Sequence, residues 1–360
     1  MAYTIQAATV VIRNKSDEAP NAHGLEKPSW TPSNAIGLAN SQQATRLDNL
    51  LVQVAASGYR FITPTPVTHQ RVLANDTRRC SATLRDIFGW NLPFEASILA
   101  PALRAAMAGA GVLQPCGDLW RSSVRIASID DDLFVHSPFP TLQADAVFFG
   151  PDTYRFARFI RQALPMSALP SRAGELRVLD VGCGSGAGGI VAARMLASPT
   201  NRIALYCNDI NPLALSYAAV NAAHAGLPVQ LAPGDALSSV GGEFDLIISN
   251  PPYLDDLAQR AYRHGGGHLG SGLSLRIARE AIGRLAPGGS LLLYTGVAMV
   301  GGEDAFLAAL QPILSAAGCD WLYEEIDPDV FGEELDQPGY AGVERIAAVG
   351  LIATRRRHSD

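Results

Sequence analysis

The stretch RVLDVGCGSGAGG, residues 177–189, decides the fold. It opens with an apolar run that predicts a short buried strand, and an aspartate, Asp180, lies near the end of that run. The glycines that follow tolerate positive φ angles and let the backbone approach a ligand closely. Residues 187–196 then predict a helix. The succession matches the G-x-G-x-x-G pattern of ligand-binding α/β folds, although a plain tight turn between strand and helix would also favour glycine.

The same alternation of strand and helix continues toward the C-terminus. Short strands are predicted at 203–207, 229–232, 244–249, 290–295, 321–326 and 346–354. Helices are predicted between them, over 212–224, 274–285 and 304–317. Such alternation is typical of βαβ units, in which helices cover both faces of a mostly parallel sheet. Because ligands bind these sheets beyond the carboxyl ends of the strands, we expect the functional residues there.

Three aspartates at strand ends favour a cofactor that carries a cationic amine. Asp180 comes just before the glycine loop, where a carboxylate would oppose a pyrophosphate but attract an ammonium group, such as that of S-adenosylmethionine. Asp209 ends the next strand and could accept both ribose hydroxyls, or cap the helix that follows. Asp235 lies past the third strand and could accept from an adenine amino group, or simply belong to a turn.

A second motif ends the fourth strand, where residues 244–253 read FDLIISNPPY. Its two prolines remove two backbone donors and stiffen the turn, and each biases the residue before it, Asn250 or Pro251, away from helix. The Asn250 side-chain oxygen and a backbone carbonyl then form a rigid rim of acceptors beside Tyr253. Such a rim suits a planar amide or amino nitrogen, which the Tyr253 ring would cover. A proline turn without chemistry is the alternative, and the glycine loop nearby weighs against it.

Over about residues 150–354, the sequence resembles the class I S-adenosylmethionine-dependent methyltransferases. It is most similar to the branch with an Asn-Pro-Pro-Tyr motif and a "small" methyltransferase domain. That branch includes the release-factor and ribosomal-protein glutamine N-methyltransferases and several ribosomal RNA amine methyltransferases. The resemblance rests on LDVGCGSG (179–186), NDINPLAL (208–215), GDAL (234–237), FDLIISNPPY (244–253) and LAPGGSLLLYTG (285–296).

The resemblance implies an α/β fold, namely a Rossmann-like sheet of seven strands with the last one antiparallel. It implies S-adenosyl-L-methionine as the cofactor and no metal. The implied cofactor-binding residues are Asp180, Gly182, Gly184, Gly186, Asp209, Ile210, Asp235, Ala236 and Asn250. Among them, the aspartate and glycines of the first motif would surround the methionyl part, Asp209 the ribose and Asp235 the adenine. The implied catalytic residues, which would hold the acceptor nitrogen, are Asn250, Pro251 and Tyr253.

The sequence leaves open which class of molecule accepts the methyl group. We favour a protein glutamine side chain, because a net charge of −6 weighs mildly against nucleic acid. The alternatives are an exocyclic base amine in RNA or DNA, and a regulator that binds the cofactor without catalysis. Residues 262–268, YRHGGGH, depart from the glutamine enzymes. The histidines at its positions 264 and 268 could suggest a metal, but three intervening glycines disfavour a helix, so we expect a mobile loop over the acceptor site.

Composition and patterning predict the domain organisation. With 360 residues, 48% of them hydrophobic and 17% charged, the chain is too apolar to be disordered and long enough for two domains. We expect a mobile tail over 1–35, a substrate-recognition domain over 36–140, a connector with a helix over 141–170, and the methyltransferase domain over 171–357. Within 36–140, helices are predicted from 41 to about 58 and over 67–75, 81–88 and 95–108, with strands at 119–129 and 133–136, a winged-helix-like set.

The cysteines and the hydropathy pattern point to the cytoplasm. The five cysteines are widely spaced and form no CxxC pair, which disfavours a disulfide framework or a zinc site. The longest apolar stretch, residues 290–300, falls well short of the roughly 18 residues of a spanning helix. The first residues lack the pattern of a signal peptide. We therefore expect a cytoplasmic protein without a membrane partner, of unknown oligomeric state.

Overall fold

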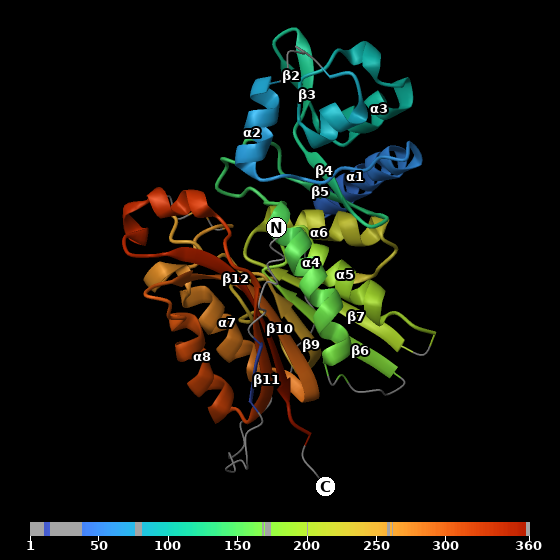
Figure 1. The fold of residues 1–360 in the computed structure, drawn as a ribbon. Coiled ribbons are helices and arrows are strands. Elements are labelled where there is room, and N and C mark those ends of the chain that lie inside the picture. The colour runs from blue at the N-terminus through green and yellow to red at the C-terminus, as the bar shows by residue number, and fades with distance from the viewer. Residues whose placement is uncertain are drawn as a thin grey trace, which may run out of the picture.

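The fold consists of a large α/β domain and a smaller N-terminal domain that lies above it (Figure 1). The computed structural model describes residues 11–14, 38–75, 81–167, 169, 174–199, 201–257, 260 and 262–357. The side chains of 11–14 and 38–44 are outside this description.

The large domain is built on one twisted sheet. Its main strands are β6 (Gly174–Val181), β7 (Asn201–Asp209), β8 (Val229–Pro233), β9 (Phe244–Ser249), β10 (Leu285–Met299), β11 (Cys319–Asp327) and β12 (Arg345–Arg355). They lie in the order β11-β12-β10-β9-β6-β7-β8. The central pairs β10–β9, β9–β6, β6–β7 and β7–β8 are parallel, whereas β12 is antiparallel to both β10 and β11. This confirms the predicted α/β sheet of seven strands with its last strand antiparallel.

An eighth strand lies at the edge of the sheet, within the segment that we predicted to be a mobile tail. β1 (Val11–Asn14) pairs antiparallel with β11, with Val11 opposite Glu324 and Asn14 opposite Trp321. The prediction is therefore wrong for these four residues, and the rest of 1–35 lies outside the described residues. The physical reason is that β11 offers an open edge of backbone donors and acceptors, which a β-branched segment can pair with.

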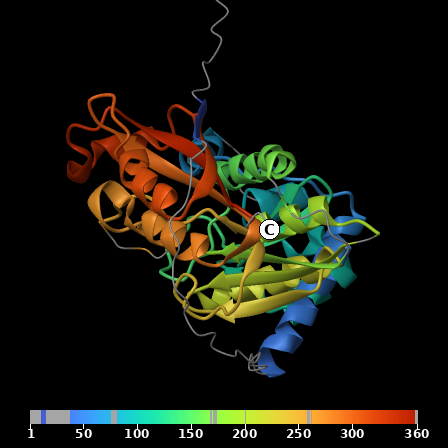
Figure 2. The same ribbon diagram turned by 90° about the horizontal axis from the view of Figure 1, so that it is seen from below.

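Helices cover both faces of the sheet (Figures 1 and 2). One face carries α4 (Pro151–Ala163), α5 (Ala187–Leu196) and α6 (Pro212–His224), and the other carries α7 (Gly272–Ile282) and α8 (Ala305–Ala316). Successive strand residues point to opposite faces, so Leu246 and Ile248 of β9 pack on the first set of helices and Ile247 on the second. Almost every residue of β9 and β10 is thus buried, as the apolar runs predict.

The N-terminal domain differs from its prediction in three places. It contains α1 (Leu38–Ala56), α2 (Pro66–Asn75), α3 (Pro101–Gly109) and the strands β2 (Leu113–Cys116), β3 (Leu119–Ser122), β4 (Arg125–Ile129) and β5 (Asp132–His136). The helix predicted over 81–88 is only a π-helical turn, Arg85–Gly89. The helix predicted over 95–108 is divided, because the residue before Pro101 is pushed out of helical geometry. The strand predicted over 119–129 is β3 and β4, which belong to two separate hairpins.

The N-terminal domain is packed on α6 of the large domain. Leu50 and Leu51 of α1, fully buried, share one apolar cluster with Tyr217 and Val220 of α6. The side-chain oxygen of Asn221 accepts from the backbone N–H of Val135 at 2.8 Å, which adds a polar link between α6 and β5. This fixes the domain, and the connector that leaves it, against α6 near the glycine loop. Whether it has a winged-helix arrangement or recognises a substrate stays a prediction.

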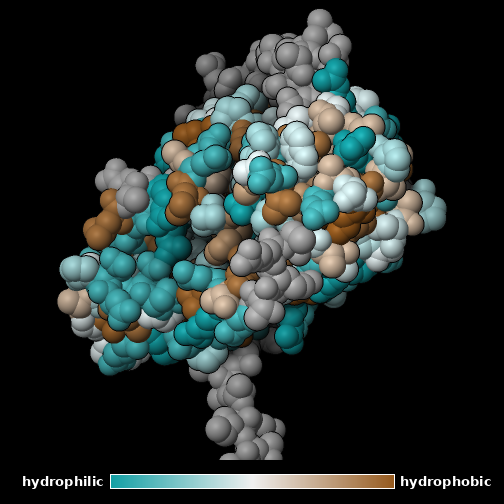
Figure 3. All heavy atoms as spheres, turned by 90° about the horizontal axis from the view of Figure 1, so that it is seen from above, coloured by the Kyte–Doolittle hydropathy of each residue, from teal (hydrophilic) through white to brown (hydrophobic). Residues whose placement is uncertain are grey.

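The surface seen from above mixes hydrophilic and hydrophobic residues (Figure 3). Large apolar side chains that are exposed include Ile62, Val72, Leu142 and Leu257. Single exposed apolar residues of this kind are ordinary for a folded protein. Among the described helices, none combines the length and the hydrophobicity that crossing a bilayer requires.

Candidate active site

The glycine loop between β6 and α5 adopts a backbone that requires glycine. Gly182, Gly184 and Gly186 have φ angles of +67°, +53° and +76°, in the left-handed region that L-residues avoid. A Cβ atom on Gly186 would also lie 3.1 Å from the Cβ of Ala218, so this glycine lets α5 approach α6. A Cβ on Gly182 would meet nothing within 4 Å, because this residue borders open space.

That open space is a cavity of about 210 Å³ beyond the carboxyl ends of β6, β7, β8 and β9. The predicted site residues that line it are Asp180, Gly182, Gly184, Asp209, Ile210, Asp235, Ala236, Asn250, Pro251 and Tyr253. Gly186 is outside this lining. Gly186 stands at the start of α5 and lets this helix pack against Ala218, and its contact with the cofactor stays a prediction.

Two carboxylates lie at the glycine loop, the buried Asp180 and the half-buried Asp209. Oδ2 of Asp180 accepts from the N–H of Gly189 at 2.7 Å, and burial raises the pKa of Asp180 to about 7. Asp209 accepts from the N–H groups of Gly184 and Asn211, both at 2.9 Å, and burial raises its pKa too. The two carboxylates repel each other, which contributes to the shift of Asp180. The alternative that Asp209 caps α6 is wrong, because Asn211 accepts from the N–H of Leu213 in that role.

Asp235, at the rim of the cavity, has a partner that the sequence did not reveal. Its two carboxylate oxygens bind the guanidinium of Arg276, on α7, at 2.5 and 2.8 Å. These hydrogen bonds hold the pKa of Asp235 below its usual range. Asp235 and Arg276 are 41 positions apart and meet only because α7 folds back beside the end of β8. A ligand that bonds to Asp235 would therefore share its carboxylate with Arg276.

The Asn-Pro-Pro-Tyr turn follows β9, which pairs in parallel with β6, so the turn and the glycine loop lie side by side at the cavity. Asn250, Pro251 and Pro252 line the cavity, and the Asn250 side chain forms no hydrogen bond with any residue that the structure describes. Tyr253 is buried, with its ring edge-on to Phe331 at 5.9 Å between centroids, and its hydroxyl donates to the carboxylate of Asp152. The amide of Asn250 is thus available to a ligand, whereas the hydroxyl of Tyr253 is already engaged.

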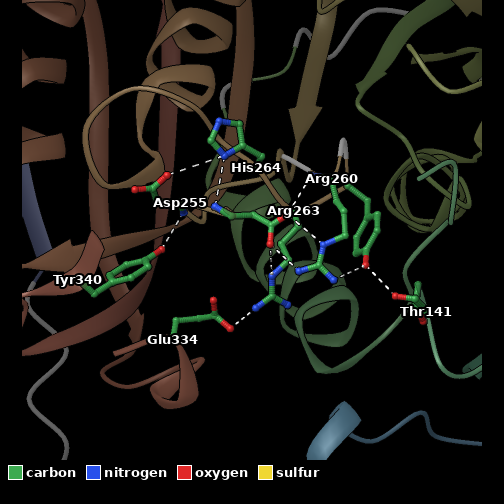
Figure 4. Close-up of polar contacts among 9 residues, drawn as sticks. Thr141, Asp255, Arg260, Arg263, His264, Glu334 and Tyr340 are labelled. Carbon is green, nitrogen blue, oxygen red and sulfur yellow. Dashed lines mark hydrogen bonds and ion pairs between the residues drawn. The ribbon is translucent and has the colours of Figure 1, made fainter. Parts of the chain in front are cut away.

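Leu254, Tyr262 and Arg263 of the loop after the turn also line the cavity, and this loop is tied to other parts of the chain at several points (Figure 4). Asp256 binds Arg260 through both oxygens, and Arg263 pairs with Glu334 of the short helical turn Gly332–Asp336. Tyr262 donates to the carbonyl of Thr141 at 2.9 Å, which links the loop to the connector. The loop we expected to be mobile is therefore anchored on both sides. Residues 258, 259 and 261 lie outside the described residues.

The two histidines of this loop have no metal-site geometry. The ring Nδ1 of His264 accepts from the backbone N–H of Asp256 at 3.2 Å. Within the part of the chain that the structure describes, no three His, Cys, Asp or Glu side chains cluster as metal ligands. His264 instead helps to shape the loop.

Residues 161–299 match the family model of the methyltransferase small domain. This part of the chain is similar to a methyltransferase small domain. This confirms the resemblance at the level of the family, and the matched region includes the glycine loop and the Asn-Pro-Pro-Tyr turn but stops short of the last two strands of the sheet.

The names of the curated relatives that match this chain refer to different methyl acceptors. Ribosomal RNA small subunit methyltransferase C of Shewanella sp. (strain MR-4) is 45% identical over 95 residues, which is 26% of each chain. The release factor glutamine methyltransferase of Deinococcus radiodurans is 39% identical over 169 residues, 44% of this chain and 55% of that protein. The chain thus spans only about a quarter to about a half of the length of these relatives.

Solved structures show a more distant likeness. The T. thermophilus 16S rRNA N2 G1207 methyltransferase (RsmC), in complex with AdoMet and guanosine, aligns with a TM-score of 0.41 at 17% identity. The alignment covers 74% of this chain and 64% of that one. A likeness at this level carries no argument about activity.

Proposed function

We propose that the protein is an S-adenosylmethionine-dependent N-methyltransferase that acts on a planar amide or amino nitrogen. The observation that carries this proposal is the Asn250 side chain, which lines the same cavity as the glycine loop and has no hydrogen-bond partner among the described residues. The polar atoms of this half-buried side chain are accessible from the cavity, so a ligand can complete their hydrogen bonds.

The residues of the cavity suit the cofactor. Asp180 offers a buried carboxylate for the ammonium group, and Asp209, held by two backbone N–H groups, keeps lone pairs free for ribose hydroxyls. The space beside Gly182 admits close approach of the ligand to the backbone. When bound, S-adenosylmethionine supplies a methyl group on a positively charged sulfur.

The Asn-Pro-Pro-Tyr turn would orient the acceptor nitrogen. The Asn250 oxygen and a backbone carbonyl accept its two hydrogens, which turns the nitrogen lone pair toward the methyl donor. Orientation of this kind can lower a barrier by about 7–11 kcal/mol. The carbonyl dipoles also stabilise the positive charge that develops on nitrogen. The nitrogen becomes acidic as the N–CH₃ bond forms, so its proton passes to water without a strong base.

A protein glutamine side chain is our first candidate for the acceptor. The alignment with the release factor glutamine methyltransferase extends over 169 residues, and the net charge of −6 disfavours a broad phosphate-binding surface. A glutamine amide also presents the planar N–H₂ group that the rim of acceptors suits.

An exocyclic base amine is the second candidate, and one observation favours it. The rings of Phe148 and Tyr262 both line the cavity and are nearly parallel, 11° apart in plane with centroids at 6.4 Å. Aromatic rings stack on bases with about 1–3 kcal/mol per base. The match to ribosomal RNA small subunit methyltransferase C supports the same reading.

Digestion of labelled product distinguishes these acceptors. The purified protein is incubated with methyl-labelled S-adenosylmethionine and a cell extract, and the product is treated with protease or nuclease. Label released by protease alone supports glutamine, and label released by nuclease alone supports a base. Phe148→Leu should lower the methyl-transfer activity roughly 10-fold if the acceptor is a base, and much less if it is a glutamine. No label above background with any extract would reject catalysis and favour the regulator.

Cofactor affinity should depend on pH through Asp180. Its pKa of about 7 means that the carboxylate is largely protonated at pH 5.5 and half ionised at pH 7. Because an ammonium group is attracted only by the ionised form, we expect binding to weaken about 10-fold from pH 7 to pH 5.5. Titration calorimetry with S-adenosylhomocysteine measures this, and Asp180→Asn should remove most of the dependence. An affinity that is flat over this range would contradict the assigned role.

A further inference from the structure

Tyr253 of the Asn-Pro-Pro-Tyr turn is held on three sides by parts of the chain outside that motif. Its hydroxyl donates to Oδ2 of Asp152, in the first turn of α4. One face of the ring lies on Gly296 of β10, where a Cβ atom would come within 2.2 Å of the ring. The ring of Phe331 packs edge-on against it at 5.9 Å between centroids. The ring therefore has little freedom to tilt or slide.

Asp152 is the polar centre of this arrangement. The residue is only 6% exposed, and its Oδ1 accepts from the hydroxyl of Tyr294 at 3.0 Å and from Nη1 of Arg155 at 3.3 Å. Arg155 in turn donates to Asp327, at the end of β11, at 2.9 Å. A carboxylate in the first turn of a helix is also favoured by the helix dipole. Through these bonds Asp152 links α4 to three other parts of the fold, namely the turn that follows β9, strand β10 and strand β11.

The hydrogen bond to the Asp152 carboxylate sets the orientation of the Tyr253 ring. Burial raises the pKa of Tyr253 well above its usual range, so the phenol keeps its proton and remains a donor. A hydrogen bond to a carboxylate is about twice as strong as one between neutral groups. The buried Tyr253 hydroxyl therefore gains more from bonding to Asp152 than to a neutral acceptor. Both residues line the cavity, so a shift in this bond changes the shape of the acceptor side.

We propose that Asp152 is a positioning residue for methyl transfer, which fixes the Tyr253 ring against the acceptor nitrogen through the hydrogen bond between its carboxylate and the Tyr253 hydroxyl. This proposal rests on the proposed function, because its expected effect on catalysis requires that the protein transfers a methyl group. It differs from a role in cofactor binding, because the bonds of Asp152 to side chains run to Tyr253, Tyr294 and Arg155.

A double-mutant cycle tests the proposal. Asp152→Ala and Tyr253→Phe are each expected to lower kcat about 10-fold to 100-fold, because a small misplacement of reacting groups has effects of this size. The double variant should have a kcat no lower than the worse single variant, since both changes remove the same bond. The Kd for S-adenosylhomocysteine should stay within about twofold of wild type in all three variants. Should Asp152→Ala fail to fold, Asp152→Asn, which keeps the volume and weakens the acceptor, replaces it.

Tyr323→Phe is the matched control. The Tyr323 hydroxyl donates to the carboxylate of Asp304 at 2.6 Å, so the described residues include a further, part-buried tyrosine–aspartate bond outside the cavity. This variant should lose stability to a similar degree and keep the kcat of wild type. Equal losses of kcat in Tyr323→Phe and Tyr253→Phe would mean a merely structural role and would overturn the proposal.

Losses of kcat that multiply in the double variant, or a wild-type kcat in the Asp152 variant, would also overturn it. If the wild-type protein transfers no methyl group at all, the proposed function fails, and the same cycle is then read on urea unfolding. Non-additive losses of stability would support Asp152 as the anchor of Tyr253, and additive losses would reject it.

Discussion

Replacing Asn250 by alanine is expected to lower methyl transfer by at least about 100-fold while the Kd for S-adenosylhomocysteine changes by less than about threefold. The reason is the position of this amide, which lines the cavity and forms no hydrogen bond with any described residue. Its removal breaks no hydrogen bond to a described residue, so the fold and the glycine loop should persist. What is lost is the acceptor oxygen that orients the substrate nitrogen.

Asn250→Asp is the informative companion to this variant. It keeps an oxygen acceptor at the same position and should therefore retain more activity than Asn250→Ala. Calorimetry and turnover are measured on the same preparations. Parallel losses of cofactor affinity and turnover would contradict the separate role given to Asn250, because they would make it part of the cofactor site alone.

Gly182→Ala should abolish most cofactor binding, with a loss of affinity of at least about 30-fold. The added methyl group enters the space beside the loop, where no protein atom lies within 4 Å, and it would occupy room that the ligand needs. The φ angle of +67° adds backbone strain, on the order of 1 kcal/mol. Both effects act at the same residue, so a control is required to separate them.

Gly226→Ala provides that control. Gly226 follows α6 with a φ angle of +70°, and its Cβ would also meet nothing within 4 Å, but it lies outside the cavity. The two variants should therefore lose similar stability in urea unfolding, and only Gly182→Ala should lose affinity. Equal affinity in both variants would show that the ligand does not approach the loop at Gly182.

Local sequence patterns were sufficient for most of the large domain. The helices α5 and α6 and the strand β9 begin and end where they were predicted, because glycine, Asn-Pro and Pro-Pro signals mark their boundaries. The glycine loop and the Asn-Pro-Pro-Tyr turn were placed at one cavity by topology alone, since the carboxyl ends of adjacent parallel strands meet. These are features that a short window of residues determines.

Features that depend on distant contacts could not be predicted. The bond between Tyr253 and Asp152 joins residues 101 positions apart, and the pairing of Asp235 with Arg276 depends on how α7 folds back. β1 forms because β11 leaves an edge open, which no local pattern in the tail reveals. The motif spacing did not reveal that Gly186 also lies against Ala218 of α6, which gives this glycine a packing role.

The most direct test of the central claim is a methyl-transfer measurement that counts both products. The purified protein, methyl-labelled S-adenosylmethionine and extract from cells that lack this gene are combined, and the labelled product is analysed by mass spectrometry. The account predicts label on a nitrogen, one S-adenosylhomocysteine for each methyl group transferred, and almost no product with Asn250→Ala. Transfer by Asn250→Ala equal to that of wild type, or methyl groups found only on oxygen or carbon, would contradict it.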